Sequence, residues 1–481
     1  MQSKPTKTFF GHPFQLSSIF HIELWERFSY YGMQAILLYY LYFSVAEGGL
    51  GIDKNEAGGI VAVYAGSVYL ATLLGGWFAD RVIGTERTLF YSGITVMLGH
   101  IALAILPGTM GLIAGLVLIA LGSGGVKASA SAMVGALYEA PETKQLRDAG
   151  FSIFYLAINI GALFGPLFTG YLQTSAGFHY GFGIAAIGMA FGLWQYSRGR
   201  KQLPETPAPN PLQASEKKVA WLVAIVALAV IALLFQQGWV HYSNFKNVLF
   251  GVVIVAVILY FARLFISGRK LGAKQSYILA YVPLFLAICV FWSVWYQVHT
   301  AVAVYFEGTV DRMIGGFEVP PGWLGSIESL WVICLASSLA WLWTKMGDKQ
   351  PKTPLKFALS LFCVGGTYAC FLPFTSQGVA MPFIGIVGVL FLLTIAELLI
   401  SPISLSLATK IAPEQFKTQM VALNFLAISL GITSGGKIFG AYFDEQNLSQ
   451  FFMLLTQMGV ITGAVLLLLV PVLNRLLKGS E

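Results

Sequence analysis

The sequence predicts an all-α polytopic membrane protein, and three observations lead to this fold class. Of its 481 residues, 57% are hydrophobic and only 11% are charged, whereas a soluble protein carries about a quarter charged residues. The apolar residues gather in runs of about 20, the length that crosses a bilayer as a helix. The polar segments between the runs are too short to fold as a separate catalytic domain.

Fourteen spans are expected, in an order of six, two and six. The first six fall near 17–43, 57–79, 88–107, 110–136, 148–173 and 177–196, and the inserted two near 219–240 and 246–267. The last six fall near 276–305, 322–345, 355–375, 380–409, 416–441 and 450–474. This order divides the chain into an N-terminal six-helix bundle (1–196), a linker with the inserted pair (197–275) and a C-terminal six-helix bundle (276–481).

Lysine and arginine are distributed unequally between the two sets of loops. One set contains only Lys54, Lys246 and Arg312, while the other contains most of the basic residues behind the net charge of +7. Because cytoplasmic loops are enriched in Lys and Arg, both termini are expected in the cytoplasm, and nucleic acid is not an expected partner. The first apolar run follows Lys4 and Lys7 and is too long for a signal-peptide core, so we interpret it as a retained span.

The cysteines give no sign of a metal site or of a disulfide framework. All four lie in apolar segments without metal-ligand spacing: Cys289, Cys334, Cys363 and Cys370. They are typical of small core residues, and no cofactor is expected. No loop offers a place for a Ser/His/Asp triad, which argues against a hydrolase.

The first span carries a polar stripe that is unusual inside a membrane. At about 3.6 residues per turn, one helix face is shared by Glu23, Glu26, Arg27, Tyr30, Tyr31 and Gln34. Charges within a bilayer are costly, point into protein or a watery cavity, and usually serve a pathway. The stripe therefore predicts a functional site; a structural ion pair that locks two helices is the other interpretation.

The fourth and fifth spans add further polar side chains. Lys127 follows a run of glycine and serine that allows another helix to approach closely. It lies about ten residues from the helix end, too deep to reach the interface comfortably, and its expected partners are Glu23 and Glu26. Tyr155 and Asn159 share a face of the fifth span, where they either line a site or hydrogen-bond a neighbouring helix.

One stretch of the fifth span recurs in the second half of the chain. Residues 155–161 resemble residues 425–431, and the same offset relates Gly165 to Gly435. The fifth span of the N-terminal bundle (148–173) therefore matches the fifth span of the C-terminal bundle (416–441), in the same topology. Parallel repeats of this kind build the two halves of major facilitator transporters, which hold substrate between them.

The loop after the second span points to the same superfamily. Residues 75–87 read GGWFADRVIGTER and resemble the cytoplasmic loop signature of the major facilitator superfamily. The glycines permit close helix contact, and Asp80, Arg81 and Arg87 are expected to make and break ion pairs as the two halves rock. The signature says nothing about the substrate.

These motifs resemble the proton-dependent oligopeptide transporter family. The resemblance rests on ELWERFSYYG in the first span, the glycine–lysine stretch of the fourth and FYLAINIG in the fifth. The inserted helix pair is similar to that of bacterial members, and the likeness covers essentially the whole chain. It implies a proton-coupled symporter that imports di- and tripeptides by alternating access across the bacterial inner membrane.

The resemblance also implies roles for individual residues. Glu23, Glu26, Arg27, Lys127 and Glu397 would couple protons to transport. Arg27 and Lys127 would receive the peptide carboxylate, and Asn159 with Glu397 would receive its amino terminus. The further substrate-binding residues implied are Tyr31, Tyr69, Tyr155, Trp292, Tyr296, Glu328, Ser401 and Asn424.

Several positions depart from the pattern of that family. Relatives commonly close an outer gate with an arginine at the position of Gln34 and an acid at that of Tyr296. Both are replaced here, so a neutral gate of Gln34 with Tyr296 or His299 is expected. Glu328 replaces a common asparagine and either binds the amine, titrates, or lies inertly near the helix end. Asn424 replaces a common tryptophan, which bears on the side chains accepted.

The sequence is also compatible with functions other than peptide symport. A major facilitator transporter of another small metabolite or anion would share the fold, although relatives that move non-peptides tend to lose the first-span glutamates. An intramembrane enzyme or a peptide sensor would not concentrate solute. The expectation is a monomer in the lipid bilayer that uses protons as the coupling ion.

Overall fold

The computed structural model describes residues 8–238, 244–270, 275–411 and 417–478. Residues 239–240 of the seventh predicted span and residue 416 of the thirteenth lie outside the described residues. Elsewhere the helices follow the apolar runs closely: the first span, predicted at 17–43, is α1 (Leu16–Tyr42). Hydropathy finds these boundaries because a helix satisfies its own backbone hydrogen bonds within the bilayer.

The helices before the linker are α1, α2 (Lys54–Phe78), α3 (Thr85–Ile105), α4 (Gly108–Leu137), α5 (Arg147–Ala176) and α6 (Phe178–Gly199). The inserted pair is α7 (Ala214–Gln236) and α8 (Phe245–Lys270). The remainder are α9 (Gln275–Trp295), α10 (Ala301–Gly308), α11 (Leu324–Met346), α12 (Thr353–Ala369), α13 (Leu372–Thr375), α14 (Phe383–Ile411), α15 (Lys417–Tyr442) and α16 (Leu448–Leu476).

Fourteen membrane-spanning segments are present over the described ranges. Eleven of them are long and apolar enough to cross a bilayer by length and hydropathy alone, with α9 and α10 forming one span and α12 and α13 another. The other three are α1, whose charged stripe lowers its hydropathy, and α6 and α7. The predicted all-α polytopic fold of fourteen spans is confirmed.

The contacts divide the chain into two compact units. Unit 1 comprises the described residues up to Met33 together with Leu70–Leu249, and unit 2 comprises Gln34–Tyr69 together with the described residues from Phe250 on. The dividing points lie inside α1, α2 and α8. The first two helices thus contribute one segment to each unit. The predicted three-part division at 196 and 275 concerns the repeats and stays a prediction.

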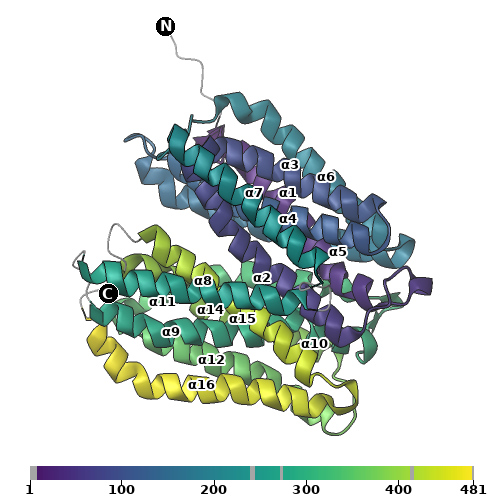
Figure 1. Ribbon diagram of the computed structural model, residues 1–481. Helices are drawn as coiled ribbons and strands as arrows, with labels where there is room; N and C mark the ends of the chain where they lie inside the picture. Colours follow the sequence, from purple (N-terminus) through teal and green to yellow (C-terminus); the bar gives the residue numbers. More distant parts are fainter. Residues whose placement is uncertain (1–7, 239–243, 271–274, 412–416, 479–481) are drawn as a thin grey trace. The chain divides into compact units, whose positions relative to one another are not determined.

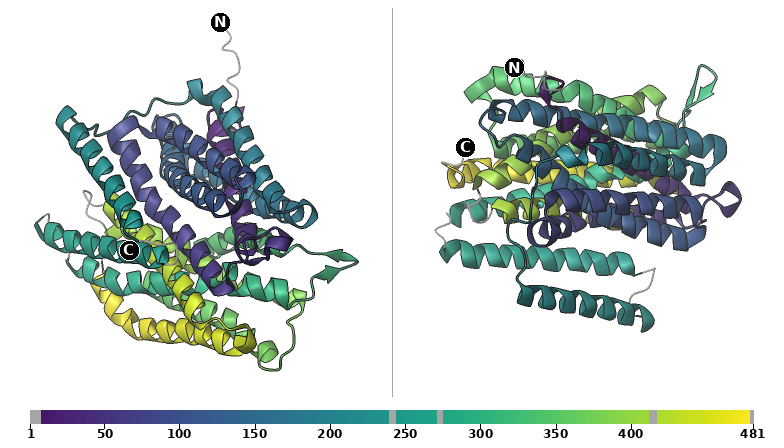
Figure 2. Two further views of the ribbon diagram at one scale, coloured as in Figure 1. Left: turned by 45° about the vertical axis from the view of Figure 1, so that its right-hand side comes forward. Right: turned by 90° about the horizontal axis from the view of Figure 1, so that it is seen from above.

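Within unit 1, α3 packs between α4 and α6, and α5 packs on α6 (Figure 1). The core beside α3 holds Leu89, Val126, Met133, Met189 and Tyr196, each at most 1% exposed. Within unit 2, α12 packs against α16 and α14, and α9 against α15. The helix α16, yellow in Figures 1 and 2, runs alongside α12.

The two repeated glycine stretches occupy equivalent contacts in their own units. In unit 1, a Cβ added at Gly161 of α5 would lie 2.7 Å from Cβ of Arg27 on α1. In unit 2, a Cβ added at Gly431 of α15 would lie 2.7 Å from Cβ of Trp292 on α9. In each unit, glycine lets the repeated helix press directly on the first helix of its half.

The span predicted at 276–305 is interrupted. A 3-10 turn at Tyr296–His299 separates α9 from α10. The Gln297 side chain stabilises the break, because its Nε2 donates to the carbonyl of Ser293 at 3.0 Å and to that of Gly435 at 2.9 Å. Thr300 Oγ1 donates to Gln297 Oε1 at 2.8 Å. Apolar composition alone carries no signal for such a break.

Two short hairpins complete the described structure. β1 (Thr8–Phe9) pairs with β2 (His12–Pro13), and β3 (Met313–Ile314) pairs with β4 (Phe317–Glu318). Both turns have two residues of positive φ, which two-residue hairpin turns favour. His12 ties the first hairpin to the end of α4, with its Nδ1 2.8 Å from the hydroxyl of Tyr138.

Candidate functional site

The predicted charged stripe of α1 forms a buried cluster in unit 1. Arg27 Nε donates to Glu23 Oε1 at 2.7 Å and lies 3.1 Å from Glu26 Oε2. The exposed fractions of the three side chains are 3%, 2% and 0% for Arg27, Glu23 and Glu26. The spacing of four residues places Glu23 and Arg27 on one face, one turn apart. Removing charged groups from water has a large desolvation cost, so stability alone does not account for a buried cluster of this kind.

Helix α4 supplies the other side of this cluster. Ser123 Oγ donates to Glu26 Oε1 at 2.7 Å. Lys127, one turn further along α4, interacts electrostatically with both glutamates and with Arg27, and its Nζ lies 5.9 Å from the ring centroid of Tyr30. Two acids and two bases therefore share one buried region. The predicted association of Lys127 with the α1 glutamates is present.

The cluster is not fully hydrogen-bonded. Within the described part of the chain, Glu23 Oε2 and Glu26 Oε2 accept no hydrogen bond, although the latter remains in ion-pair contact with Arg27. Buried polar atoms are nearly always satisfied, and the exceptions concentrate where a structure does chemistry. Two incompletely bonded carboxylate oxygens are suitable proton acceptors.

The predicted aromatic and amide residues of unit 1 lie on α1 and α5. Tyr31 interacts electrostatically with Arg27 and is half-buried. Tyr155 is 46% exposed. Asn159 is buried, and its Nδ2 donates to the carbonyl of Tyr155 at 2.8 Å, so this amide bonds its own helix.

Unit 2 contains a pair of acids. Glu328 on α11 is 7% exposed, and its Oε1 has no hydrogen-bond partner among the described residues. It interacts electrostatically with Glu397 on α14 and with Tyr368 on α12. The structure therefore brings the two predicted acids together, and Tyr368 joins them.

The remaining predicted residues of unit 2 lie on different helices. Trp292 Nε1 and Asn424 Oδ1 are buried without a hydrogen-bond partner among the described residues. Ser401 is half-buried on α14. Tyr69 packs on Phe425, with ring centroids 6.2 Å apart. Unpaired donors and acceptors of this kind are suited to a polar ligand.

The two residues predicted to form a neutral gate are in contact. Both belong to unit 2, where Gln34 Nε2 donates to the hydroxyl of Tyr296 at 3.3 Å. That hydroxyl donates to the carbonyl of Val61 on α2 at 3.2 Å. His299 packs on Tyr296, with ring centroids 5.2 Å apart. No charge takes part in this contact.

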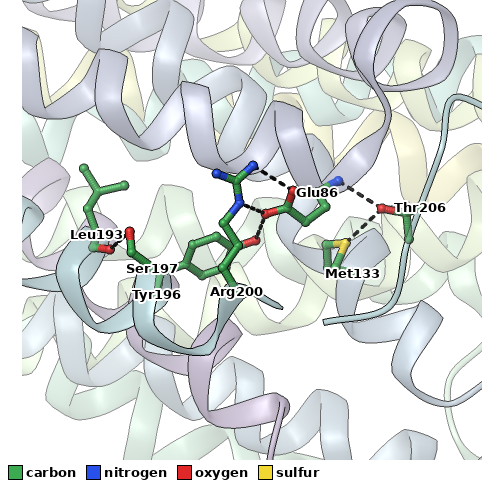
Figure 3. Close-up of polar contacts among 7 residues, drawn as sticks. All are labelled: Glu86, Met133, Leu193, Tyr196, Ser197, Arg200 and Thr206. Carbon is green, nitrogen blue, oxygen red and sulfur yellow. Dashed lines mark hydrogen bonds and ion pairs between the residues drawn. The ribbon is translucent and has the colours of Figure 1, made fainter. Parts of the chain in front are cut away.

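The linker contacts the signature segment, which is helical where a loop was expected. Asp80 and Arg81 lie in a π-helical turn (Ala79–Ile83) that follows α2, and Arg87 lies in the first turn of α3. Arg81 Nη2 forms an ion pair with Glu216 Oε1 at 3.0 Å, at the beginning of α7. Asp80 and Arg87 have exposed side chains. Glu86, in the first turn of α3, takes part in the polar contacts of Figure 3. The predicted exchange of ion pairs at this loop stays a prediction.

Two residues near the predicted site are not among the sequence-based predictions. Ser123 lies four residues before Lys127, so its helical spacing is a usable signal. Tyr30, which shares the predicted polar face of the first span, has its ring centroid 5.9 Å from Nζ of Lys127. Tyr368 has no local signal, since its proximity to Glu328 depends on the packing of α11 against α14 and of α14 against α12.

Similarity to known proteins identifies the family of this chain. The sequence profile of the POT family matches residues 86–451. The chain belongs to the POT family of proton-dependent oligopeptide transporters. It is 39% identical to a di-/tripeptide transporter of Lactococcus lactis subsp. cremoris, with 97% of each chain covered. It is also 39% identical to the uncharacterized transporter YclF of Bacillus subtilis (strain 168), covering 100% of this chain and 98% of that one.

Solved structures of POT proteins agree over the whole length. A peptide transporter in complex with sulfate has a TM-score of 0.94 and 38% identity, covering 99% of this chain and 98% of that one. A POT family transporter in complex with 5-aminolevulinic acid has a TM-score of 0.90 and 30% identity, covering 98% and 99%. The chain is thus a multi-pass membrane protein of a transporter family and not an enzyme.

Proposed function

We propose that this POT protein is a proton-coupled symporter that imports di- and tripeptides by alternating access. The observation that carries the proposal is the buried cluster of Glu23, Glu26 and Arg27 with Lys127 nearby. A group of ionisable side chains within a membrane protein usually marks an ion or substrate pathway. The printed name of the Lactococcus relative supports di- and tripeptides as the substrate class.

The two charged ends of a peptide match two groups of side chains in this protein, one cationic and one acidic. A zwitterionic peptide has one carboxylate and one ammonium group at a limited separation. Arg27 and Lys127 supply cations for the carboxylate, and Glu397 with Asn159 supplies acceptors for the ammonium group. Glu328 adds a second acid beside Glu397 and strengthens this end. The remainder of the substrate contacts a further set of side chains, namely Tyr31, Tyr69, Tyr155, Trp292, Tyr296, Ser401 and Asn424.

Coupling follows from competition for the cations. Arg27 is bonded to Glu23 and contacts Glu26, and an opposite charge at such a distance attracts the ionised form of a carboxylate. A peptide carboxylate at Arg27 and Lys127 weakens these contacts, so a glutamate takes up a proton more readily. Because coupling is reciprocal, the proton also favours peptide binding. Proton and peptide therefore cross together.

Gating uses different residues on the two sides of the membrane. Gln34 with Tyr296 and His299 closes the outer side without charges. Asp80, Arg81 and Arg87 exchange ion pairs on the cytoplasmic side. The excess of lysine and arginine in one set of loops supports cytoplasmic termini for a monomer in the bacterial inner membrane.

The decisive experiment is uptake of labelled dialanine into proteoliposomes under an inward proton gradient. The proposal requires accumulation that an uncoupler collapses and that an unlabelled tripeptide blocks. Failure to accumulate dialanine, with protein shown to be folded, would contradict it. The candidate would then be transport of another small metabolite or anion, selected by Glu328 and Asn424, and 5-aminolevulinic acid is the first compound to try because a POT transporter binds it.

A further inference from the structure

The linker between α6 and α7 is bonded to the turn that joins α2 to α3 and to the first turn of α3. Figure 3 shows the contacts of Glu86 in that first turn. The carbonyl of Thr206 accepts from the backbone N–H of Thr85 at 3.1 Å. The hydroxyl of Thr206 accepts from the backbone N–H of Glu86 at 3.0 Å and lies 3.4 Å from Sδ of Met133. One linker residue thus satisfies two orphan donors in the first turn of α3.

The linker continues along the same turn. The N–H of Asn210 donates to the carbonyl of Asp80 at 3.1 Å, and the N–H of Leu212 donates to that of Arg81 at 2.9 Å. Gly84 has φ +84°, and a Cβ at this position would collide with the carbonyl of Thr206. Glycine is therefore required for the close approach of linker and turn.

The side chains of Glu86 and Arg200 fasten the start of the linker. Arg200 Nε donates to Glu86 Oε1 at 2.6 Å and Nη2 donates to Oε2 at 3.0 Å, a two-bond arrangement. The Tyr196 hydroxyl donates to Glu86 Oε1 at 3.1 Å. The guanidinium also lies 3.9 Å from the ring centroid of Phe90. The Glu86 side chain is 16% exposed and that of Arg200 is 28% exposed. The pair is therefore partly buried and contributes more to stability than a fully exposed surface ion pair.

The two inserted helices belong to different units. The ion pair of Glu216 with Arg81 fastens the beginning of α7 to unit 1. In unit 2, Phe261 of α8 packs on Phe285 of α9, with ring centroids 5.1 Å apart. Lys437 of α15 lies 4.1 Å from the ring centroid of Phe250 at the unit boundary in α8. The inserted helix α7 is therefore attached to unit 1, and α8 is attached to unit 2.

We propose that Glu86, Tyr196, Arg200 and Thr206, here called the linker clamp, hold the linker on the α2–α3 turn throughout transport. Glu86 and Arg200 act as positioning residues. The clamp makes α7 part of unit 1, so the inserted pair is divided between the units that move. The backbone of Arg81 is held in place by the linker, while its side chain is left to exchange ion pairs. The inference rests on the proposed function only where it invokes movement during transport.

Limited proteolysis tests the clamp without any transport measurement. Trypsin cleavage after Lys201 needs the linker to leave the turn, so Glu86→Gln and Arg200→Gln should each be cleaved about fivefold faster than wild type, the factor for loss of roughly one ion-pair contact. Tyr196→Phe should have a smaller effect. Glu205→Gln changes an exposed linker carboxylate outside the clamp and is the matched control. Equal cleavage of Glu86→Gln and Glu205→Gln would overturn the clamp.

A disulfide tests whether the linker stays in place during the cycle. Thr85→Cys with Thr206→Cys, in a chain whose native cysteines are serines, should form a bond across the backbone contact. We expect equal dialanine uptake by the oxidised and reduced forms. Uptake lost on oxidation and recovered on reduction would mean that the linker must detach, and would overturn the inference.

Kinetics separate positioning from substrate binding. In Glu86→Gln, the maximal uptake rate should fall while the half-saturating peptide concentration stays at the wild-type value, because the clamp touches no proposed substrate residue. Arg200→Lys retains the charge with fewer bonds and should recover part of the rate. If wild-type protein accumulates no peptide, the proposed function fails, while the cleavage comparison still decides whether the clamp exists.

Discussion

Two acids and one base lie within little more than one helix turn of α1: Glu23, Glu26 and Arg27. Arg27 is shared between two carboxylates, and Ser123 donates to one of them. Replacing a buried ion pair by apolar residues is often neutral or stabilising. The retention of three charges here therefore favours a functional role over a structural lock.

The first prediction concerns the proton site. Glu23→Gln keeps the shape of the side chain but removes its titration, so uptake driven by a pH gradient should fall to the level of empty liposomes. Peptide exchange without a gradient should persist in part. Glu142→Gln alters an exposed loop carboxylate and should leave both unchanged. Full gradient-driven uptake by Glu23→Gln would exclude this glutamate from coupling.

The second prediction concerns the donor to Glu26. Ser123→Ala removes a hydrogen bond to a buried charged group, which costs about 1.5–3 kcal/mol, and should lower the thermal unfolding midpoint in detergent. Ser129→Ala on the same helix removes a buried hydroxyl that has no partner among the described residues. That control should be neutral or stabilising. Similar midpoints for the two variants would refute the assigned contact.

Helix contacts in each unit depend on glycine. Gly161 lets α5 press on α1 beside Arg27, and Gly431 lets α15 press on α9 beside Trp292. The same repeat thus sets the position of a predicted site residue in both units. The break between α9 and α10, held by Gln297, then turns His299 and Tyr296 toward each other.

The third prediction concerns this packing. Gly161→Ala forces α5 away from α1 and should cost about 1–3 kcal/mol, as overpacking does, with reduced uptake because Arg27 moves. Gly183→Ala on α6 places its methyl group in open space. It should be neutral or slightly stabilising, since alanine favours helix. Thermal midpoints in detergent compare the two.

The fourth prediction concerns the outer gate. Gln34→Arg alone, or Tyr296→Glu alone, puts an uncompensated charge into a buried contact and should impair uptake strongly. The double variant forms an ion pair there and should retain more activity than either single variant. Double-variant uptake no better than that of the single variants would argue against a gate at this contact.

For the molecule as a whole, the division of α1 and α2 between units is the notable property. Each helix has one segment in unit 1 and one in unit 2. Gln34, Tyr39 and Tyr42 of α1 all hydrogen-bond residues of the second half of the chain. The units defined by contacts therefore differ from the halves defined by the repeats.

The fifth prediction concerns orientation in the membrane. In a chain whose native cysteines are serines, Thr309→Cys should react with an impermeant maleimide in intact cells. Lys201→Cys should react only in inverted vesicles. Both positions are exposed, so reactivity reports the side of the membrane. The reverse pattern would overturn the cytoplasmic placement of the termini.

Much of the fold and part of the candidate site can be predicted from hydropathy and residue spacing alone. Fourteen spans followed from apolar runs because each membrane helix must satisfy its own backbone. The face shared by Glu23, Arg27 and Gln34 followed from helical geometry. Lys127 followed from its depth within an apolar run, and the family resemblance added Glu397. These features are local in the chain, and local rules of length, period and charge are sufficient for them.

Contacts between distant segments required the folded structure. The bond from Ser123 to Glu26, the approach of Glu328 to Glu397 and the linker clamp join residues that are far apart in sequence. The break at Gln297 depends equally on the carbonyl of Gly435, which α15 presents to it. Such contacts arise from the packing of whole helices, and packing depends on complementary surfaces that no single stretch of sequence contains.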